Sequence, residues 1–110
     1  MMESQMKVAL DNFVKEMKET EVCKRYYYQL GKIKKNPELF KKVNEYRQKN
    51  YEIQNTCQES ELFEKMDAFE REYEKFRDNP IVDDFLRAEL ALCRMIQEIN
   101  IFITDEIGFE

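Results

Sequence analysis

The sequence contains no histidine and no tryptophan, and it has only two glycines and two prolines among 110 residues. Histidine is the commonest general base and a frequent metal ligand, so its absence excludes Ser-His and Cys-His nucleophile pairs and argues against an enzyme. A β-rich fold needs turn residues at short, regular intervals, and Gly and Pro are too scarce here to supply them. Strong helix formers dominate instead, which predicts an all-α protein.

Long hydrophobic runs are also missing. Leu90–Cys93 is among the longest, whereas a membrane span needs about 18 apolar residues. The first 20 residues lack the apolar stretch of a signal peptide, so we expect a cytoplasmic protein without a membrane span. Cys23, Cys57 and Cys93 match neither a disulfide framework nor a metal knuckle, and we expect reduced thiols. Eight Phe and six Tyr supply a real core for one domain, residues 1–110.

Apolar residues recur at helical spacing in five segments separated by capping residues. Asn36-Pro37 and Asn79-Pro80 each start a helix, because Asn caps well and Pro fits the first turn. Gly108 is the expected end of the last helix, and whether the first two helices are continuous stays open. The prediction is an antiparallel helical bundle of four to five helices with a long C-terminal helix, at residues 3–18, 20–35, 37–56, 60–78 and 80–107.

The last helix has two apolar faces. At about 1.5 Å per residue it is about 40 Å long, more than the extent of a compact domain of this size. We therefore predict self-association or a helical partner. The broad, core-facing stripe consists of Ile81, Phe85, Ala88, Leu92, Met95, Ile96, Ile99, Phe102 and Ile103. The second, narrower line holds the candidate oligomer contacts Leu86, Leu90, Cys93 and Ile101.

The formal net charge of −5 hides two opposite regions. Residues 22–50 carry nine basic and two acidic side chains, whereas residues 51–110 carry six basic and sixteen acidic ones. We favour pairing of the basic helices with acidic ones, within a subunit or across an interface. The alternative is an RNA-binding module in segment 24–49, which we rank second because an acidic protein repels phosphate at long range. Its contacts would be Lys24, Arg25, Lys32, Lys34, Lys35, Lys41 and Lys42, beside three consecutive tyrosines.

Carboxylates are abundant, but a helical di-metal centre uses Glu-x-x-His pairs, and this chain has no histidine. Gly-rich phosphate loops, nucleophile elbows and HExxH motifs are absent from the sequence. We therefore assign no catalytic or metal-binding residues. Glu89 borders the apolar stripe of the last helix, and we expect it to pair with a basic neighbour at the helix seam.

Several short motifs follow one another in a distinctive order. They are Glu19-Thr20-Glu21, Asn36-Pro37-Glu38-Leu39, Phe69-Glu70, Asn79-Pro80-Ile81-Val82 and Phe85-Leu86-Arg87-Ala88-Glu89. In this order and spacing the chain resembles the YlbF/YmcA family of small helical bacterial proteins, the competence-regulator family. The family-motif positions of the last helix are Asn79, Pro80, Val82, Phe85, Ala88 and Glu89.

The resemblance implies a non-enzymatic regulatory protein that forms homo-oligomers, or hetero-oligomers with related helical proteins. It also implies a link to competence, sporulation and biofilm control, and to mRNA processing that depends on ribonuclease Y. Some members carry a cysteine-bearing C-terminal tail connected with an iron–sulfur cluster. No cysteine follows Cys93 in this sequence, so we expect no cofactor here.

Overall fold

A computed structural model describes residues 3–56 and 58–108, and every regular element in these ranges is a helix. The all-α prediction and the long C-terminal helix are confirmed. The six helices, in chain order, are α1 (Ser4–Lys18), α2 (Glu21–Lys34), α3 (Pro37–Thr56), α4 (Glu59–Glu72), α5 (Glu74–Arg77) and α6 (Pro80–Ile107).

Side-chain caps fix where three of these helices begin. The Thr20 hydroxyl accepts a hydrogen bond from the Cys23 N–H at 3.3 Å, so α1 and α2 are separate helices. Asn36 Oδ1 accepts from the Leu39 N–H at 3.2 Å, and Asn79 Oδ1 accepts from the Ile81 N–H at 3.0 Å. Gly108 ends α6 in the left-handed conformation, with φ of 73°. The helix boundaries therefore follow the capping residues in the sequence.

The predicted helix of residues 60–78 is interrupted at Tyr73. Its backbone angles, φ −102° and ψ 10°, leave the helical range and separate α4 from the single turn of α5. The Tyr73 ring packs edge-on against Tyr46 of α3, with ring centroids 5.2 Å apart. Helix propensity does not encode such a local irregularity, and the continuous helix expected over this segment was wrong in this respect.

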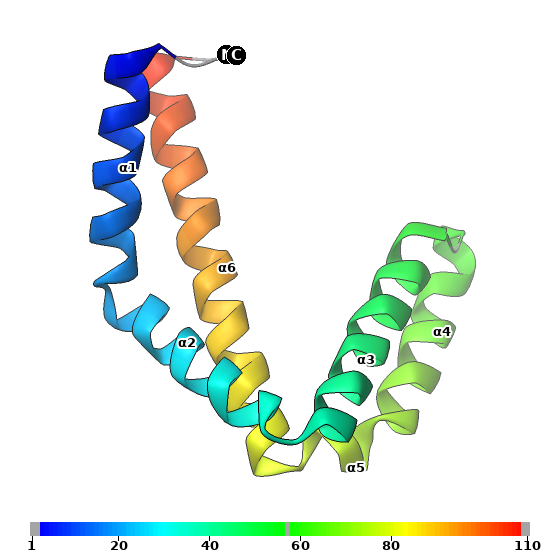
Figure 1. The fold of residues 1–110 in the computed structure, drawn as a ribbon. Coiled ribbons are helices and arrows are strands. Elements are labelled where there is room, and N and C mark those ends of the chain that lie inside the picture. Colours follow the sequence, from blue (N-terminus) through cyan, green and yellow to red (C-terminus); the bar gives the residue numbers. More distant parts are fainter. Residues whose placement is uncertain (1–2, 57, 109–110) are drawn as a thin grey trace.

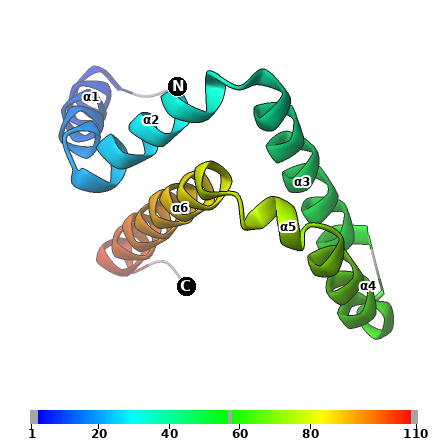
Figure 2. The ribbon, with the colours of Figure 1, turned by 90° about the horizontal axis from the view of Figure 1, so that it is seen from below.

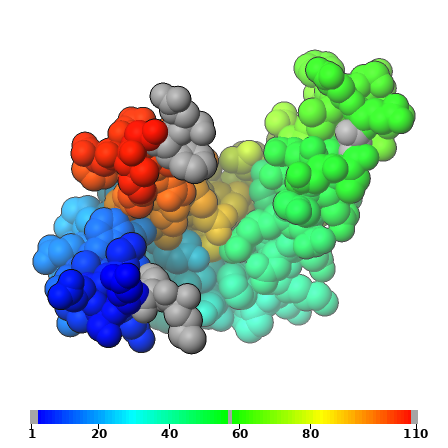
Figure 3. Space-filling view, turned by 90° about the horizontal axis from the view of Figure 1, so that it is seen from above, coloured from blue at the N-terminus to red at the C-terminus, as the bar shows by residue number. Residues whose placement is uncertain are grey.

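The helices form two arms that meet at an elbow (Figures 1 and 2). One arm contains α1, α2 and α6, and the other is the hairpin of α3 and α4 (Figure 3). The radius of gyration is 17.7 Å, whereas a compact chain of this length has about 13 Å. The predicted single bundle is therefore not confirmed, because the helices spread over an extent of 48 × 38 × 23 Å.

The best-buried apolar cluster lies at the elbow, where α2, α3 and the start of α6 meet. Four side chains there, Ile33, Val43, Val82 and Phe85, have no exposed surface, and we call this cluster the elbow core. Partly buried neighbours extend it toward α5 and the beginning of α3. They are Tyr26, Leu30, Leu39, Phe40, Phe76, Ile81 and Leu86.

Within the described ranges, none of the helices is both long enough and apolar enough to cross a membrane.

Candidate functional site

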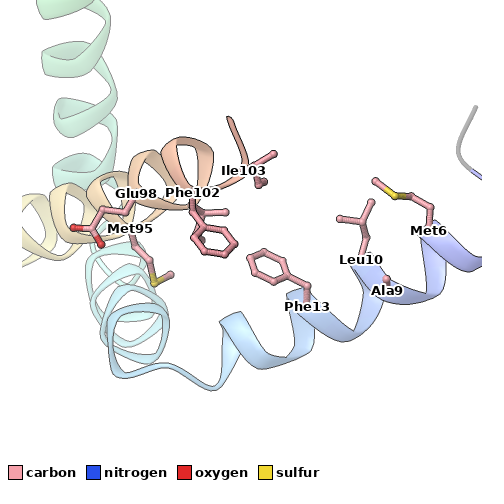
Figure 4. A pocket seen from close by; sticks show the side chains of 9 residues that line it. Met6, Ala9, Leu10, Phe13, Met95, Glu98, Phe102 and Ile103 are labelled. Atoms are coloured by element: carbon pink, nitrogen blue, oxygen red, sulfur yellow. The ribbon is translucent and has the colours of Figure 1, made fainter. Parts of the chain in front are cut away.

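An apolar groove lies between α1 and the second half of α6 (Figure 4). It has a volume of about 540 Å³. Phe13 of α1 points toward Phe102 of α6 across it. We call it the arm groove, and its lining residues are Met6, Ala9, Leu10, Phe13, Met95, Glu98, Ile99, Phe102 and Ile103.

The local sequence explains why both walls of the groove are apolar. Met6, Leu10 and Phe13 are spaced by four and three residues, so they share one face of α1. Yet α1 has no buried residue at all. An amphipathic helix is stabilised when its apolar face is covered by other apolar side chains. The apolar face of α1 is instead open to the groove, with the apolar residues of α6 on the opposite side.

The predicted core-facing stripe of α6 divides into two halves. Phe85 and Ala88 are buried against α2 and α3, and Leu92 is half-buried. Further along, Phe102 is 64% exposed, and Ile96 and Ile103 are also exposed. The stripe continues in sequence, but α1 diverges from α6 and does not cover it.

The second apolar line of α6 lies on another side of the helix. Leu86 packs against the elbow core, whereas Leu90, Cys93 and Ile101 are exposed. None of these four residues lines the arm groove. A rotation of about 100° per residue separates Ile101 from the groove residue Phe102. The structure thus presents two separate apolar surfaces on the same helix.

The family-motif positions build the elbow. Val82, Phe85 and Ala88 are buried, and Asn79 caps the helix that carries them. Glu89 forms an ion pair with Arg47 of α3 at 3.3 Å. This motif therefore holds α3 against α6.

The Arg47 guanidinium also lies over the Phe85 ring, 5.2 Å from its centroid. The side chains of Arg47 and Glu89 are 37% and 24% exposed, so the pair is partly shielded from water. Arg47 is thus the basic neighbour that we expected for Glu89 at the helix seam.

The seven basic residues considered for RNA do not share one surface. Lys24, Lys32 and Lys34 are exposed on α2, and Lys35 is exposed at its C-cap. Arg25 lines a hollow with Asp84 and Arg87 of α6. Lys41 and Lys42 line hollows on the side of α4 and α5, with acidic neighbours that include Glu45, Glu52 and Glu72.

Among the described residues, the pKa values of two cations are shifted, and both cations are in exposed ion pairs. A hydrogen bond from Lys49 to Glu72, at 2.9 Å, raises the pKa of Lys49. A hydrogen bond from Arg87 to Asp83, at 2.7 Å, raises the pKa of Arg87. Both shifts favour the charged form that these groups already hold at neutral pH, so neither group is set up for proton transfer.

Cysteine and carboxylate side chains form no metal-binding group of three or more in the part of the chain that the structure describes. Cys23 is buried and Cys93 is exposed, both with free thiols. Cys57 lies outside the described residues.

Comparison with known proteins identifies the relatives of this fold. A family model described as control of competence regulator ComK, YlbF/YmcA, matches residues 8–108. The chain belongs to the YlbF/YmcA family. A UPF0342 protein from Caldicellulosiruptor bescii is similar, with 26% identity over 96 residues, which cover 86% of this chain and 81% of that relative. No solved structure matches the chain.

The YlbF/YmcA family is described by its regulatory role, the control of competence, and not by a catalysed reaction. In this YlbF/YmcA chain the motif positions build the elbow, while apolar side chains of the arm groove are exposed to solvent. The positions that mark the family and the arm groove therefore lie in different parts of the molecule.

Proposed function

We propose that this chain is a non-enzymatic regulatory adaptor that acts by helical oligomerisation, with the arm groove as the site where a second copy binds. The proposal rests on the groove, where large apolar side chains of the kind that fill protein cores are exposed to solvent. Contiguous exposed apolar surface of this kind marks an interaction site. The extended shape supports the same reading, because a chain with so large a radius of gyration leaves apolar surface uncovered.

Charge favours a second copy as the occupant. Helix α1 carries three lysines and two acids, whereas α6 beyond Met95 carries Glu98, Asp105 and Glu106 and no basic residue. A two-fold interface would place each α1 beside the α6 of the other copy. The lysines of α1 would then lie near the carboxylates of α6 on both sides of the contact, which favours this orientation.

The apolar surface of the groove is also large enough to stabilise a dimer. Association costs about 4–15 kcal/mol in lost freedom of motion. Complete burial of one large apolar side chain contributes about 1.5–3 kcal/mol. The groove offers eight apolar lining residues per copy, so two copies together supply enough apolar surface to offset that cost.

The family resemblance adds finer expectations, which we propose for this chain as well. The oligomer would include related helical proteins, and it would act in competence, sporulation and biofilm control and in ribonuclease Y-dependent mRNA processing. A related chain would use the same groove, because its apolar walls accept any amphipathic helix of similar shape.

Light scattering on two neighbouring variants tests the proposal. Phe102 and Ile101 are similarly exposed, at 64% and 59%, but only Phe102 lines the groove. We expect the wild type to be at least a dimer at micromolar concentration and Phe102→Glu to have the mass of one chain, 13.5 kDa. Ile101→Glu is the matched control and should keep the wild-type mass.

Two results would contradict the groove as the interface. If the wild type is a well-folded monomer at this concentration, self-association is excluded. If Ile101→Glu or Leu90→Lys dissociates the oligomer while Phe102→Glu does not, the second apolar line of α6, with Leu86 and Cys93, is the interface instead. Circular dichroism on each variant establishes that helix content is retained.

A further inference from the structure

The outer face of α2 points away from the elbow core and combines cations with exposed aromatic rings. We define it by the residues of α2 and its C-cap that lie about 100° or more around the helix from Ile33, all of which are exposed. Tyr27 and Tyr28 are 52% and 66% exposed, and the Tyr27 ring lies edge-on against Tyr26, with ring centroids 5.8 Å apart. The outer face consists of Glu21, Lys24, Tyr27, Tyr28, Gly31, Lys32 and Lys34 of α2, together with Lys35 at its C-cap.

The cations of this face make few ion pairs in the part of the chain that the structure describes, although the Lys34 ammonium lies over the Phe40 ring, 6.0 Å from its centroid. Lys24 approaches Glu19 at 3.7 Å, and both side chains are more than half exposed, so the pair is weak. Lys32, Lys34 and Lys35 make no ion pair with any described residue. The only acidic residue within α2 is Glu21. The face is therefore locally positive on a protein that is acidic overall.

Gly31 lies in the middle of this face and has no structural reason to be glycine. A Cβ atom at Gly31 would meet nothing within 4 Å, and its φ is not in the left-handed region. Glycine is a poor helix former, so its presence inside α2 weakens the helix. It does leave open backbone between Tyr28 and Lys35, where a flat ligand can approach closely.

We propose that the outer face of α2 binds a single-stranded polynucleotide without sequence preference. The lysines would contact phosphates, and bases would stack on Tyr27 and Tyr28 beside the gap at Gly31. Stacking on aromatic rings next to a positive strip is how such strands are held in general.

An acidic protein segment is the competing ligand, and composition argues against it. Lysine is depleted in protein–protein interfaces, whereas all four cations of this face are lysines. The polynucleotide site goes beyond the proposed adaptor function and does not depend on it. The outer face of α2 shares no residue with the arm groove, so a dimer would carry two such sites.

Fluorescence anisotropy with labelled 12-nucleotide oligouridine and oligodeoxythymidine tests the site. Contact of four lysines with phosphates predicts a log–log slope of affinity against salt of about −3, from about −0.7 per phosphate. Equal binding of the two probes indicates a site for any single strand, and tighter binding of oligouridine indicates contacts to the 2′-hydroxyl. No binding of either probe at low salt would overturn the proposal.

Charge and ring variants locate the site. We expect Lys34→Glu with Lys35→Glu to weaken binding by about ten-fold or more, while Lys75→Glu on α5 has little effect. Tyr28→Ala should weaken binding by about five-fold or more. Tyr51→Ala, on α3 and equally exposed at 64%, is the matched control and should bind like the wild type. Equal losses for the two tyrosine variants would contradict a role for stacking.

Gly31→Ala separates binding from folding. An alanine fits the open space, so this variant should melt at a higher temperature than the wild type and yet bind the oligonucleotides more weakly. Undiminished binding would contradict a close approach of the oligonucleotide to the backbone at Gly31. Displacement of the oligonucleotide by polyglutamate of similar length at equal concentration would identify an acidic polypeptide as the ligand and overturn the proposal.

Discussion

The elbow core and the arm groove use the same kinds of residue and differ in what covers them. Phe85, near the start of α6, has no exposed surface, while Phe102, near its end, is 64% exposed. Both belong to one apolar stripe of a single helix. Helical periodicity therefore identifies an apolar face, whereas the burial of that face depends on which other helices pack against it.

The neighbouring helices explain the difference. At the elbow, α2 and α3 both pack against α6, and the pair of Arg47 with Glu89 closes the seam. Toward the end of α6, only α1 among the described helices faces it, because an interruption of the helix at Thr20 separates α1 from α2. One amphipathic helix covers only part of the face that two helices cover at the elbow.

The largest expected contrast is in stability. Phe85→Ala should lower the free energy of unfolding by about 3–5 kcal/mol, because it leaves a cavity in a fully buried site. Phe102→Ala should change it by less than about 1 kcal/mol in the monomer, since its ring is already mostly in water. Urea denaturation of dilute protein measures both. Similar losses for the two variants would show that the arm is packed as firmly as the elbow.

A smaller effect is expected at the seam of the elbow. Glu89→Gln should cost about 1 kcal/mol, because it leaves the partly buried charge of Arg47 without its partner. Asp67→Asn is the control, because it removes an exposed pair with Arg71 on α4 and should cost less than about 0.5 kcal/mol. The same denaturation assay applies, and an equal cost for both would mean that the seam pair adds nothing to the elbow.

Much of the fold could be predicted from the sequence because local signals decide helix ends. Asn79-Pro80 and Asn36-Pro37 mark the starts of α6 and α3, and Gly108 marks the end of α6. These signals act over a few residues, so one sequence suffices to recognise them. The break at Tyr73 carries no such signal, and it was missed.

The candidate site depends on tertiary arrangement and was predicted only in part. The stripe containing Ile99 and Phe102 was recognised as apolar, but its exposure follows from the divergence of α1, which no periodicity encodes. By contrast, helical periodicity alone places Lys24 and Tyr28 on the side of α2 that faces away from Ile33. Lys41 shares α3 with its acidic neighbours Glu45 and Glu52, whereas the position of Lys42 beside Glu72 depends on where α4 returns.

Hydrogen exchange at increasing protein concentration shows whether a second copy covers the arm and leaves the elbow unchanged. Amides of α1 and of residues 95–107 should become more protected as the chain associates, while those near Val43 and Phe85 keep the same protection at every concentration. Protection of the arm that is already high in dilute monomer, or that does not change with concentration, would contradict the account.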